Sequence, residues 1–446
     1  FIFIFYFFII NLICIKFYTT NTKLLFQNLL NLFKKNKIAL LIFIFSFLLY
    51  LAYNLKTAIL VNHFNRVPYK WGGVTGDEAI VIRNIVFSAS RRFHPYFFLP
   101  LYPLYEFLMF ISNNLYCSLS IIWCFLGSLS CVFLYKSLNL IIPRLKIIKT
   151  ILLLCFTFTL SQLLMSYIFD LYIIAGCYLS IFIYLVSKEL KNKEYDIINM
   201  LLIAIITAFI FGVNIPNLIT CLIISSGIFI VKKNKKTILS FFLIILLLIC
   251  SFVSIKSVTD NRISYKNIFG NKINFYLDIY FETNFKNNLT NFYQETLLKP
   301  FTYIDCKINN ITNPALIFWA LFVLTTVFAS YLYLSNKAKD DNKALYFSLL
   351  AAILYNFCAN FFWCPKMGFL FSQNFLVLLF IIMAMSINNI DSYLKTKKYS
   401  NCFKYSLIIC LSVLLFFEIT LNTKTVLRQH NNAIKYNPQN LLLEKR

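Results

Sequence analysis

The sequence carries little charge for its length, and this shortage decides the class of protein. Only 13% of its 446 residues are charged, whereas 60% are hydrophobic. Soluble domains have about 25% charged residues. The net charge of +25 would suit a nucleic-acid-binding protein, but the lysines fall in short clusters between apolar runs. We therefore expect an all-α, polytopic integral membrane protein that meets membrane lipids and binds no nucleic acid.

Histidine is scarce and the cysteines are not paired in sequence, which excludes several kinds of site. The three histidines are far apart, and no two of the 13 cysteines are spaced as CxxC. Most cysteines fall in apolar segments, where a free thiol behaves as a small apolar side chain. We predict no metal-binding residues. The chain also has no convincing internal repeat and no Gly/Ser linker, so we expect one transmembrane domain over 1–446.

The apolar segments are long enough to cross a bilayer many times. A span needs roughly 20 apolar residues to cross about 30 Å of hydrocarbon. Eleven segments qualify, or twelve if residues 1–15 are counted. The eleven lie near residues 38–55, 114–135, 150–168, 171–187, 197–213, 217–231, 237–255, 314–335, 344–362, 368–388 and 405–421.

Basic residues cluster in every second loop between these segments. Short cytoplasmic loops are enriched in Lys and Arg, so the alternation predicts which loops face the cytoplasm of a plasma (inner) membrane protein. It also requires residues 97–112 not to cross, and their prolines and Glu106 suit a helix that lies in the interface or is partly embedded. The basic clusters lie at 34–37, 144–149, 188–193, 232–236, 337–343 and 395–404.

This topology leaves two long loops on the outer side, residues 56–113 and 256–313. Long loops in compact membrane proteins are usually functional. The first contains GDEAIVIRNIVFSASRRFHPYFFLPLYPLYEF, from Gly76 to Phe107, in which the adjacent acids Asp77 and Glu78 precede arginines and a Pro/Tyr-rich run. Another acid, Asp170, stands alone at the predicted outer mouth of two spans. Acids at a membrane are costly to dehydrate, so we interpret these as candidate site residues.

In this order, the residues resemble the GT-C superfamily of membrane glycosyltransferases. GDEAIVIRNI is similar to the family's acidic motif, FFLPLYPLYEFLMF resembles its proline–tyrosine segment, and Asp170 falls where the family often places a second acid. Protein O-mannosyltransferases and lipid A aminoarabinose transferases, which use polyprenyl-phosphate-linked sugars, belong to this superfamily. The resemblance covers about residues 70–190, and it implies a GT-C-like bundle of about 11–12 transmembrane helices with outer-side juxtamembrane helices.

The resemblance also implies roles for individual residues. Asp77 would be the base that takes a proton from the acceptor, in an inverting transfer, with Glu78 orienting the acceptor or a metal and Asp170 as a further catalytic residue. Cations would stabilise the departing lipid phosphate, and Arg suits phosphate because its planar fork binds with two hydrogen bonds. The predicted substrate-binding residues are Arg83, Arg91, Arg92, His94, Tyr96, Tyr102 and Lys366.

Several matters stay open at the level of sequence. The acceptor is a glycan, a lipid or a protein, and the sugar is not specified. Acidic oxygens suit a divalent cation such as Mg²⁺ or Mn²⁺, but the sequence does not identify a cofactor. Two other functions remain: a transporter or flippase of lipid-linked sugars, which should show repeated halves and broken helices near the membrane centre, and a polymerase or ligase of surface polysaccharide.

Overall fold

The structure is a computed structural model that describes residues 36–63, 101–113, 115–166, 172–192, 196–213, 215–232, 285–301, 314–335, 343–363 and 370–435. The regular structure in these ranges is entirely helical. This confirms the predicted all-α class for the described part of the chain. Helices are expected because lipid offers no water to bond to backbone N–H and C=O groups, so a span must satisfy them within itself.

The helices occur in the following order. They are α3 (Lys37–His63), α5 (Tyr102–Ser112), α6 (Leu115–Ile141), α7 (Lys146–Phe158), α8 (Leu160–Met165), α9 (Tyr172–Lys191), α10 (Ile197–Val213), α11 (Ile215–Lys232), α14 (Phe285–Asn291), the π-helix η2 (Phe292–Leu298), α15 (Pro314–Leu334), α16 (Lys343–Trp363), the 3₁₀ helix η5 (Leu370–Asn374), α17 (Leu376–Thr396) and α18 (Ser400–Lys435).

In the described residues, 7 helices are long and apolar enough to cross a membrane. The finding supports a multi-pass membrane protein. The seven segments are Lys37–Asn54, Cys117–Ile141, Tyr172–Lys191, Ala315–Leu334, Lys343–Phe362, Leu376–Thr396 and Ser400–Leu427. The predicted spans near 197–213 and 217–231 are also helical, as α10 and α11, but their apolar segments are shorter. The predicted span near 237–255 lies outside the described residues.

Two of the predicted spans are not single α-helices. The segment near 150–168 is interrupted at Thr159, which separates α7 from α8. The segment near 368–388 starts with η5, and its α-helix begins only at Leu376 and continues to Thr396. Length and apolarity could not predict whether these helices are continuous. A helix can break inside the bundle wherever neighbouring groups satisfy the freed backbone groups.

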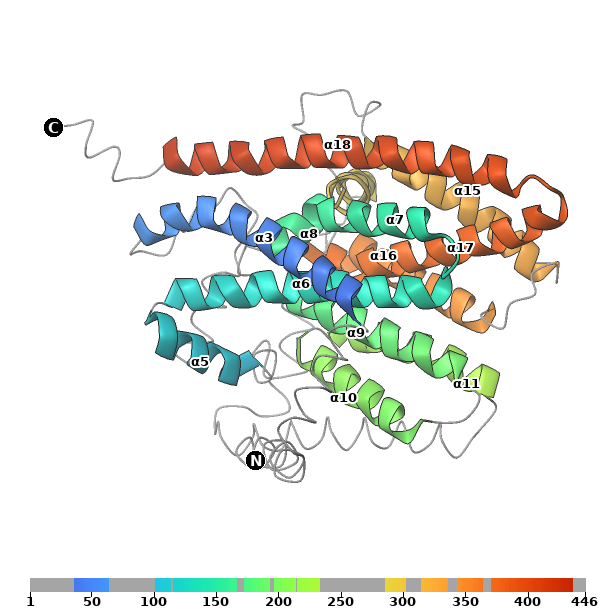
Figure 1. The fold of residues 1–446 in the computed structure, drawn as a ribbon, viewed down its shortest axis with the longest axis horizontal. Coiled ribbons are helices and arrows are strands. Elements are labelled where there is room, and N and C mark those ends of the chain that lie inside the picture. Colours follow the sequence, from blue (N-terminus) through green and yellow to red (C-terminus); the bar gives the residue numbers. More distant parts are fainter. Residues whose placement is uncertain are drawn as a thin grey trace.

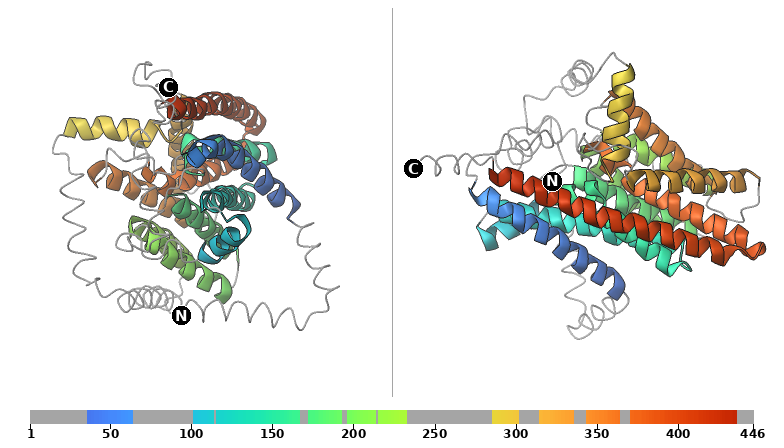
Figure 2. Two further views of the ribbon diagram at one scale, coloured as in Figure 1. Left: turned by 90° about the vertical axis from the view of Figure 1, so that its left-hand side faces the viewer. Right: turned by 90° about the horizontal axis from the view of Figure 1, so that it is seen from above.

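The long helices lie side by side along one direction, with α17 in the interior and α3 and α18 on the outside (Figures 1 and 2). We use "outer end" for the end at which α3 finishes and α6 begins, following the predicted orientation. Buried residues make up 83% of the α17 span but only 22% of the α3 and α18 spans. Among the described spans, protein therefore encloses α17 most completely, whereas α3 and α18 leave most of their residues uncovered by protein.

At the outer end, α5 packs beside the start of α6 (Figure 1). Its 11 residues correspond to about 16 Å, which is too short for a crossing. Asn113 turns the chain back in a left-handed conformation, with φ 46°, and its N–H donates to the Met109 carbonyl at 2.8 Å. Ser112 Oγ and Ser118 Oγ, 2.9 Å apart, tie α5 to α6.

At the opposite end, acids hold lysines of the predicted cytoplasmic loops. Asp391 of α17 lies 3.2 Å from Lys395 and 3.3 Å from Lys404, and these contacts fix the turn between α17 and α18. Asp196 accepts from the Asn199 backbone N–H at 3.1 Å at the start of α10. That hydrogen bond, with Lys188 nearby, lowers the pKa of the Asp196 carboxyl.

The second predicted outer loop, 256–313, enters the bundle. Within it, α14 and η2 extend across the direction of the long helices (Figure 2). The segment then reaches Phe301, which is fully buried and stacks on Phe318 of α15 with ring centroids 4.2 Å apart. This loop is therefore anchored between spans at its described end.

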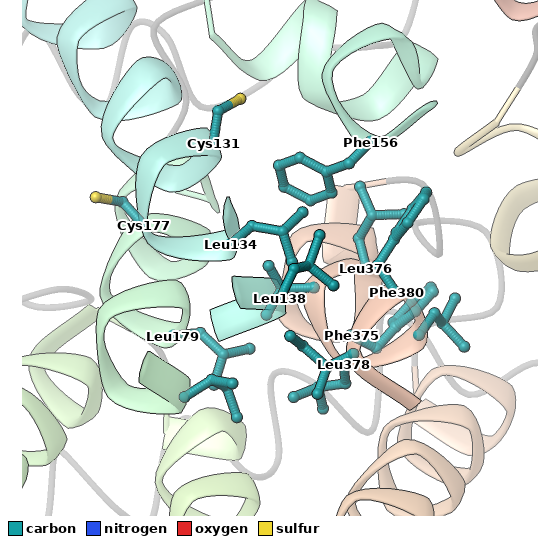
Figure 3. Close-up of a cluster of buried hydrophobic side chains, with 14 of the residues drawn as sticks. Cys131, Leu134, Leu138, Phe156, Cys177, Leu179, Phe375, Leu376, Leu378 and Phe380 are labelled. Atoms are coloured by element: carbon teal, nitrogen blue, oxygen red, sulfur yellow. The ribbon is translucent and has the colours of Figure 1, made fainter. Parts of the chain in front are cut away.

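The apolar core lies between α6, α7, α9 and α17. Leu134 and Leu138 of α6 point toward Phe156 of α7 and Phe380 of α17 (Figure 3). The rings of Phe156 and Phe380 meet edge to face, with centroids 5.5 Å apart. Packing of this kind drives helix association in lipid, because lipid tails are as apolar as leucine.

Candidate functional site

The residues predicted from sequence fall almost entirely outside the described part of the chain. Tyr102 begins α5, and only its backbone is described. The structure therefore neither brings this set together nor separates it. The residues outside the described ranges are Asp77, Glu78, Arg83, Arg91, Arg92, His94, Tyr96, Asp170 and Lys366.

A break between α7 and α8 is the first unusual feature that the structure adds. Thr159 leaves the helical conformation, with φ −55° and ψ 143°. Its hydroxyl accepts from the Gln162 N–H at 3.4 Å and so caps α8, as threonine commonly does. The sequence thus encodes an interruption in this apolar run.

Backbone groups freed by the break are satisfied from two other segments. The Leu160 N–H donates to the Phe301 carbonyl at 3.2 Å, and the Ser161 N–H donates to the Pro300 carbonyl at 2.9 Å. Asn422 Nδ2 of α18 donates to the carbonyls of Phe158 and Phe301, both at 2.7 Å. Irregular backbone at membrane depth is tolerated only where protein satisfies it in this way.

Beside the break, uncharged polar side chains from three elements form a buried cluster, which we call the η5 network. Ser161 Oγ and Ser372 Oγ are 2.5 Å apart, and Gln373 Nε2 donates to Ser161 Oγ at 2.9 Å. The network consists of Ser161 and Gln162 of α8, Ser372, Gln373 and Asn374 of η5, and Asn217 of α11.

The η5 network spans the bundle from α6 to α11. Gln162 Nε2 donates to the Gly127 carbonyl of α6 at 3.1 Å, and Asn217 Nδ2 donates to Asn374 Oδ1 at 2.8 Å. On α11 and α17 the network lies at the start of the helix, which is the predicted outer end of each span, whereas Gly127 lies about 15 Å along the axis of α6 from Cys117.

Two glycines allow this close packing. A Cβ atom at Gly127 would lie 2.1 Å from Ser166 Oγ, and one at Gly176 of α9 would lie 2.5 Å from Gln373 Oε1. Small residues at helix interfaces let backbones approach each other in membranes. Neutral amides and hydroxyls make up the network, so it suits hydrogen bonding to uncharged polar groups.

Glu418 is a second polar feature, on the face of α18 that packs against α7. It is fully buried and lies beside the thiol of Cys155. Apart from that thiol, neither of its carboxyl oxygens has a hydrogen-bond partner among the described residues. An ionised carboxylate in such a position costs several kcal/mol, so we infer that Glu418 is held as the neutral acid. An ionisable residue within a span is a functional-site hypothesis by default.

Sequence reasoning missed the η5 network, although a signal was present. TLSQ (159–162) and SQN (372–374) place consecutive polar residues inside apolar runs. A run judged by length alone hides such interruptions, whereas polar clusters inside apolar segments indicate either a break or an interior contact.

No three His, Cys, Asp or Glu side chains within the described ranges form a group that would hold a metal ion. The chain matches no protein-family model and no curated protein sequence in the comparisons that we made.

Proposed function

We propose that the protein is a membrane glycosyltransferase, which moves a sugar from a polyprenyl-phosphate donor to an acceptor on the outer face of the membrane. The order of residues within 76–107 is the observation that carries this proposal. An acid pair, then arginines, then a Pro/Tyr-rich run follow the first confident span. The multi-pass helical architecture supports it, because a lipid-linked donor requires an enzyme embedded in its membrane.

The η5 network offers further support, since it joins the ends of two segments that carry candidate residues. Ser166 is the last described residue before the segment that contains Asp170, and Leu370 is the first after the segment that contains Lys366. Close to these two ends in the sequence, Gln373 Nε2 of η5 donates a hydrogen bond to Ser161 Oγ of α8. The proposal assigns Asp170 and Lys366, which lie outside the described residues, to one site.

In the proposed reaction, Asp77 takes the proton as the acceptor O–H or N–H bond breaks. The acceptor atom forms a bond to the anomeric carbon, and the bond from that carbon to the phosphate oxygen breaks on the opposite face, so the configuration inverts. Polyprenyl phosphate leaves with the electron pair, and Arg91 and Arg92 stabilise its charge. A positioned base contributes about 10²–10⁴-fold to rate.

The test is sugar transfer from a radiolabelled polyprenyl-phosphate sugar by purified protein in detergent. Asp77→Asn keeps the size of the side chain and removes its basicity, so turnover should fall about 10²–10⁴-fold while donor binding persists. Asp278→Asn, in the second predicted outer loop, is the matched control and should transfer sugar like the wild type. Undiminished transfer by Asp77→Asn would remove Asp77 from the mechanism.

A flippase of lipid-linked sugars is the second candidate, and the break between α7 and α8 favours it. Transporters often bind substrates where helices are interrupted, and the η5 network lies beside such an interruption at Thr159. Reconstituted protein in liposomes distinguishes the two functions. Movement of intact lipid-linked sugar across the bilayer, with no transfer to any acceptor, would replace the glycosyltransferase by the flippase.

A further inference from the structure

The antiparallel helices α11 and α16 meet along a close and partly polar interface. A Cβ atom at Gly227 of α11 would lie 2.3 Å from Ser348 Oγ of α16. Nearer the outer end, Asn356 Nδ2 donates to Thr220 Oγ1 at 2.9 Å. These two contacts fix the register of the pair. A residue earlier in α11 faces a residue correspondingly later in α16, as Gly227 faces Ser348 and Thr220 faces Asn356.

One turn further toward the outer end, this register sets Asn217 of α11 against Asn360 of α16. Residues three and four apart share a helix face, so Asn217 continues the face of Thr220 and Asn360 continues that of Asn356. Both are buried, with exposed fractions of 0% for Asn217 and 6% for Asn360. The interface therefore ends in two amides enclosed by protein.

Each amide has an unused hydrogen-bonding atom. Asn217 Nδ2 is engaged with Asn374 of η5, but Asn217 Oδ1 has no hydrogen-bond partner among the described residues. Asn360 Nδ2 likewise has none within the described ranges. Buried polar atoms are nearly always paired, and each exception calls for an explanation. Here one unused acceptor and one unused donor share the same end of one interface.

Aromatic residues neighbour Asn360 and Asn374 in the sequence. Phe357, one turn before Asn360, packs edge to face on Phe375 next to Asn374, with centroids 5.2 Å apart. Phe361 packs on Phe292 of η2 at 5.6 Å. Small-molecule sites typically combine apolar and aromatic surroundings with a few placed polar groups.

We propose that Asn217 and Asn360 form a subsite for one hydroxyl group of a sugar. A hydroxyl is both donor and acceptor, so its O–H donates to Asn217 Oδ1 while its oxygen accepts from Asn360 Nδ2. One group thereby satisfies both amides. The subsite rests on the proposed function, because it takes its ligand to be the sugar of the lipid-linked donor. Because both amides are uncharged, we expect the predicted arginines, and not this subsite, to bind the donor phosphate.

The experiment compares Asn360→Leu with Asn356→Leu, one turn away on the same helix. Two properties are measured for each purified variant: the melting temperature without ligand, and the affinities for polyprenyl-phosphate mannose, polyprenyl-phosphate arabinose and polyprenyl phosphate alone. Asn360→Leu removes an amide donor that is unused without ligand, so its melting temperature should stay the same or rise. Its affinity for at least one sugar-bearing lipid should fall roughly tenfold or more, with polyprenyl phosphate binding unchanged.

Asn356→Leu should behave in the opposite way. It breaks the hydrogen bond to Thr220, so its melting temperature should fall, while the ratio of affinities for sugar-bearing lipid and polyprenyl phosphate stays at the wild-type value. If Asn360→Leu also melts early and keeps that ratio, the two amides serve each other or a water molecule, and the subsite is wrong.

Failures of the subsite and of the proposed function are distinguishable. If the wild type binds sugar-bearing lipid more tightly than polyprenyl phosphate but transfers no sugar, the subsite stands and the proposed glycosyltransferase activity is wrong. If the wild type and Asn360→Leu transfer sugar at equal rates at limiting donor, the protein is a glycosyltransferase and the subsite is wrong. Wild type that binds none of the three lipids removes both.

Discussion

The consecutive helices α17 and α18 differ sharply in how much of their surface meets protein. Protein buries 83% of the α17 span and 22% of the α18 span. Yet α18 is the more apolar of the two spans. Its buried residues form a single stripe along one face, and the stripe consists of Ser400, Leu407, Leu411, Leu414, Glu418, Asn422 and Val426.

This difference shows that apolarity does not identify the interior of a membrane protein. Lipid tails are as apolar as leucine, so a lipid-facing position and a core position accept the same side chains. Polar residues do mark the interior, because lipid cannot satisfy them. In α18, Glu418 and Asn422 lie on the buried stripe, whereas Phe416 is 67% exposed to the surroundings of the bundle.

The largest expected effect comes from a matched pair of phenylalanines. Phe380 of α17 is fully buried between Phe156 and Phe318, so Phe380→Ala should leave a cavity and lower the free energy of unfolding by about 3 kcal/mol. Phe416→Ala on α18 should change it by less than about 0.5 kcal/mol. Unfolding in mixed detergent micelles measures both. Equal losses would mean that α18 has a protein partner on its exposed face.

An intermediate effect is expected on the stripe of α18. Asn422→Leu removes the donor to the Phe158 carbonyl, whereas the Phe301 carbonyl keeps the Leu160 N–H. One unsatisfied buried carbonyl costs about 1–3 kcal/mol, so unfolding should become easier by about 2 kcal/mol in the same assay. Thr420→Leu is the control, since its exposed hydroxyl bonds only within α18. If Asn422→Leu is as stable as Thr420→Leu and the wild type, Asn422 does not stabilise the break between α7 and α8.

The smallest effect should come from Glu418→Gln. If Glu418 is held as the neutral acid, an amide of nearly the same size replaces it with a change in unfolding free energy below about 1 kcal/mol. The same variant should keep the wild-type rate of sugar transfer, because the proposed mechanism does not use Glu418. A large loss of stability would show that the carboxylate is ionised and paired with a cation. A loss of transfer at unchanged stability would bring Glu418 into the mechanism.

Much of the fold was predictable from the sequence, and the candidate site was not. The segments near 38–55 and 314–335 became α3 and α15 because a run of apolar residues of span length has no other stable conformation in lipid. The break at Thr159 was not predictable by length, because it depends on Asn422 and Pro300, which are remote in the sequence. The candidate residues in 76–100 stay predictions, since they lie outside the described residues.

Sequence by itself predicted that the described part of the chain is helical and that several of its helices are long and apolar enough to cross a membrane, since those properties follow from local apolarity and from the absence of water in lipid. Only the tertiary structure decided which apolar helix protein encloses, as it does α17, and which it leaves mostly uncovered, as it does α18. It alone paired Asn217 with Asn374 and brought Ser161 to Ser372. Such pairings depend on helix register and close approach, and both are set by packing between segments that the sequence keeps far apart.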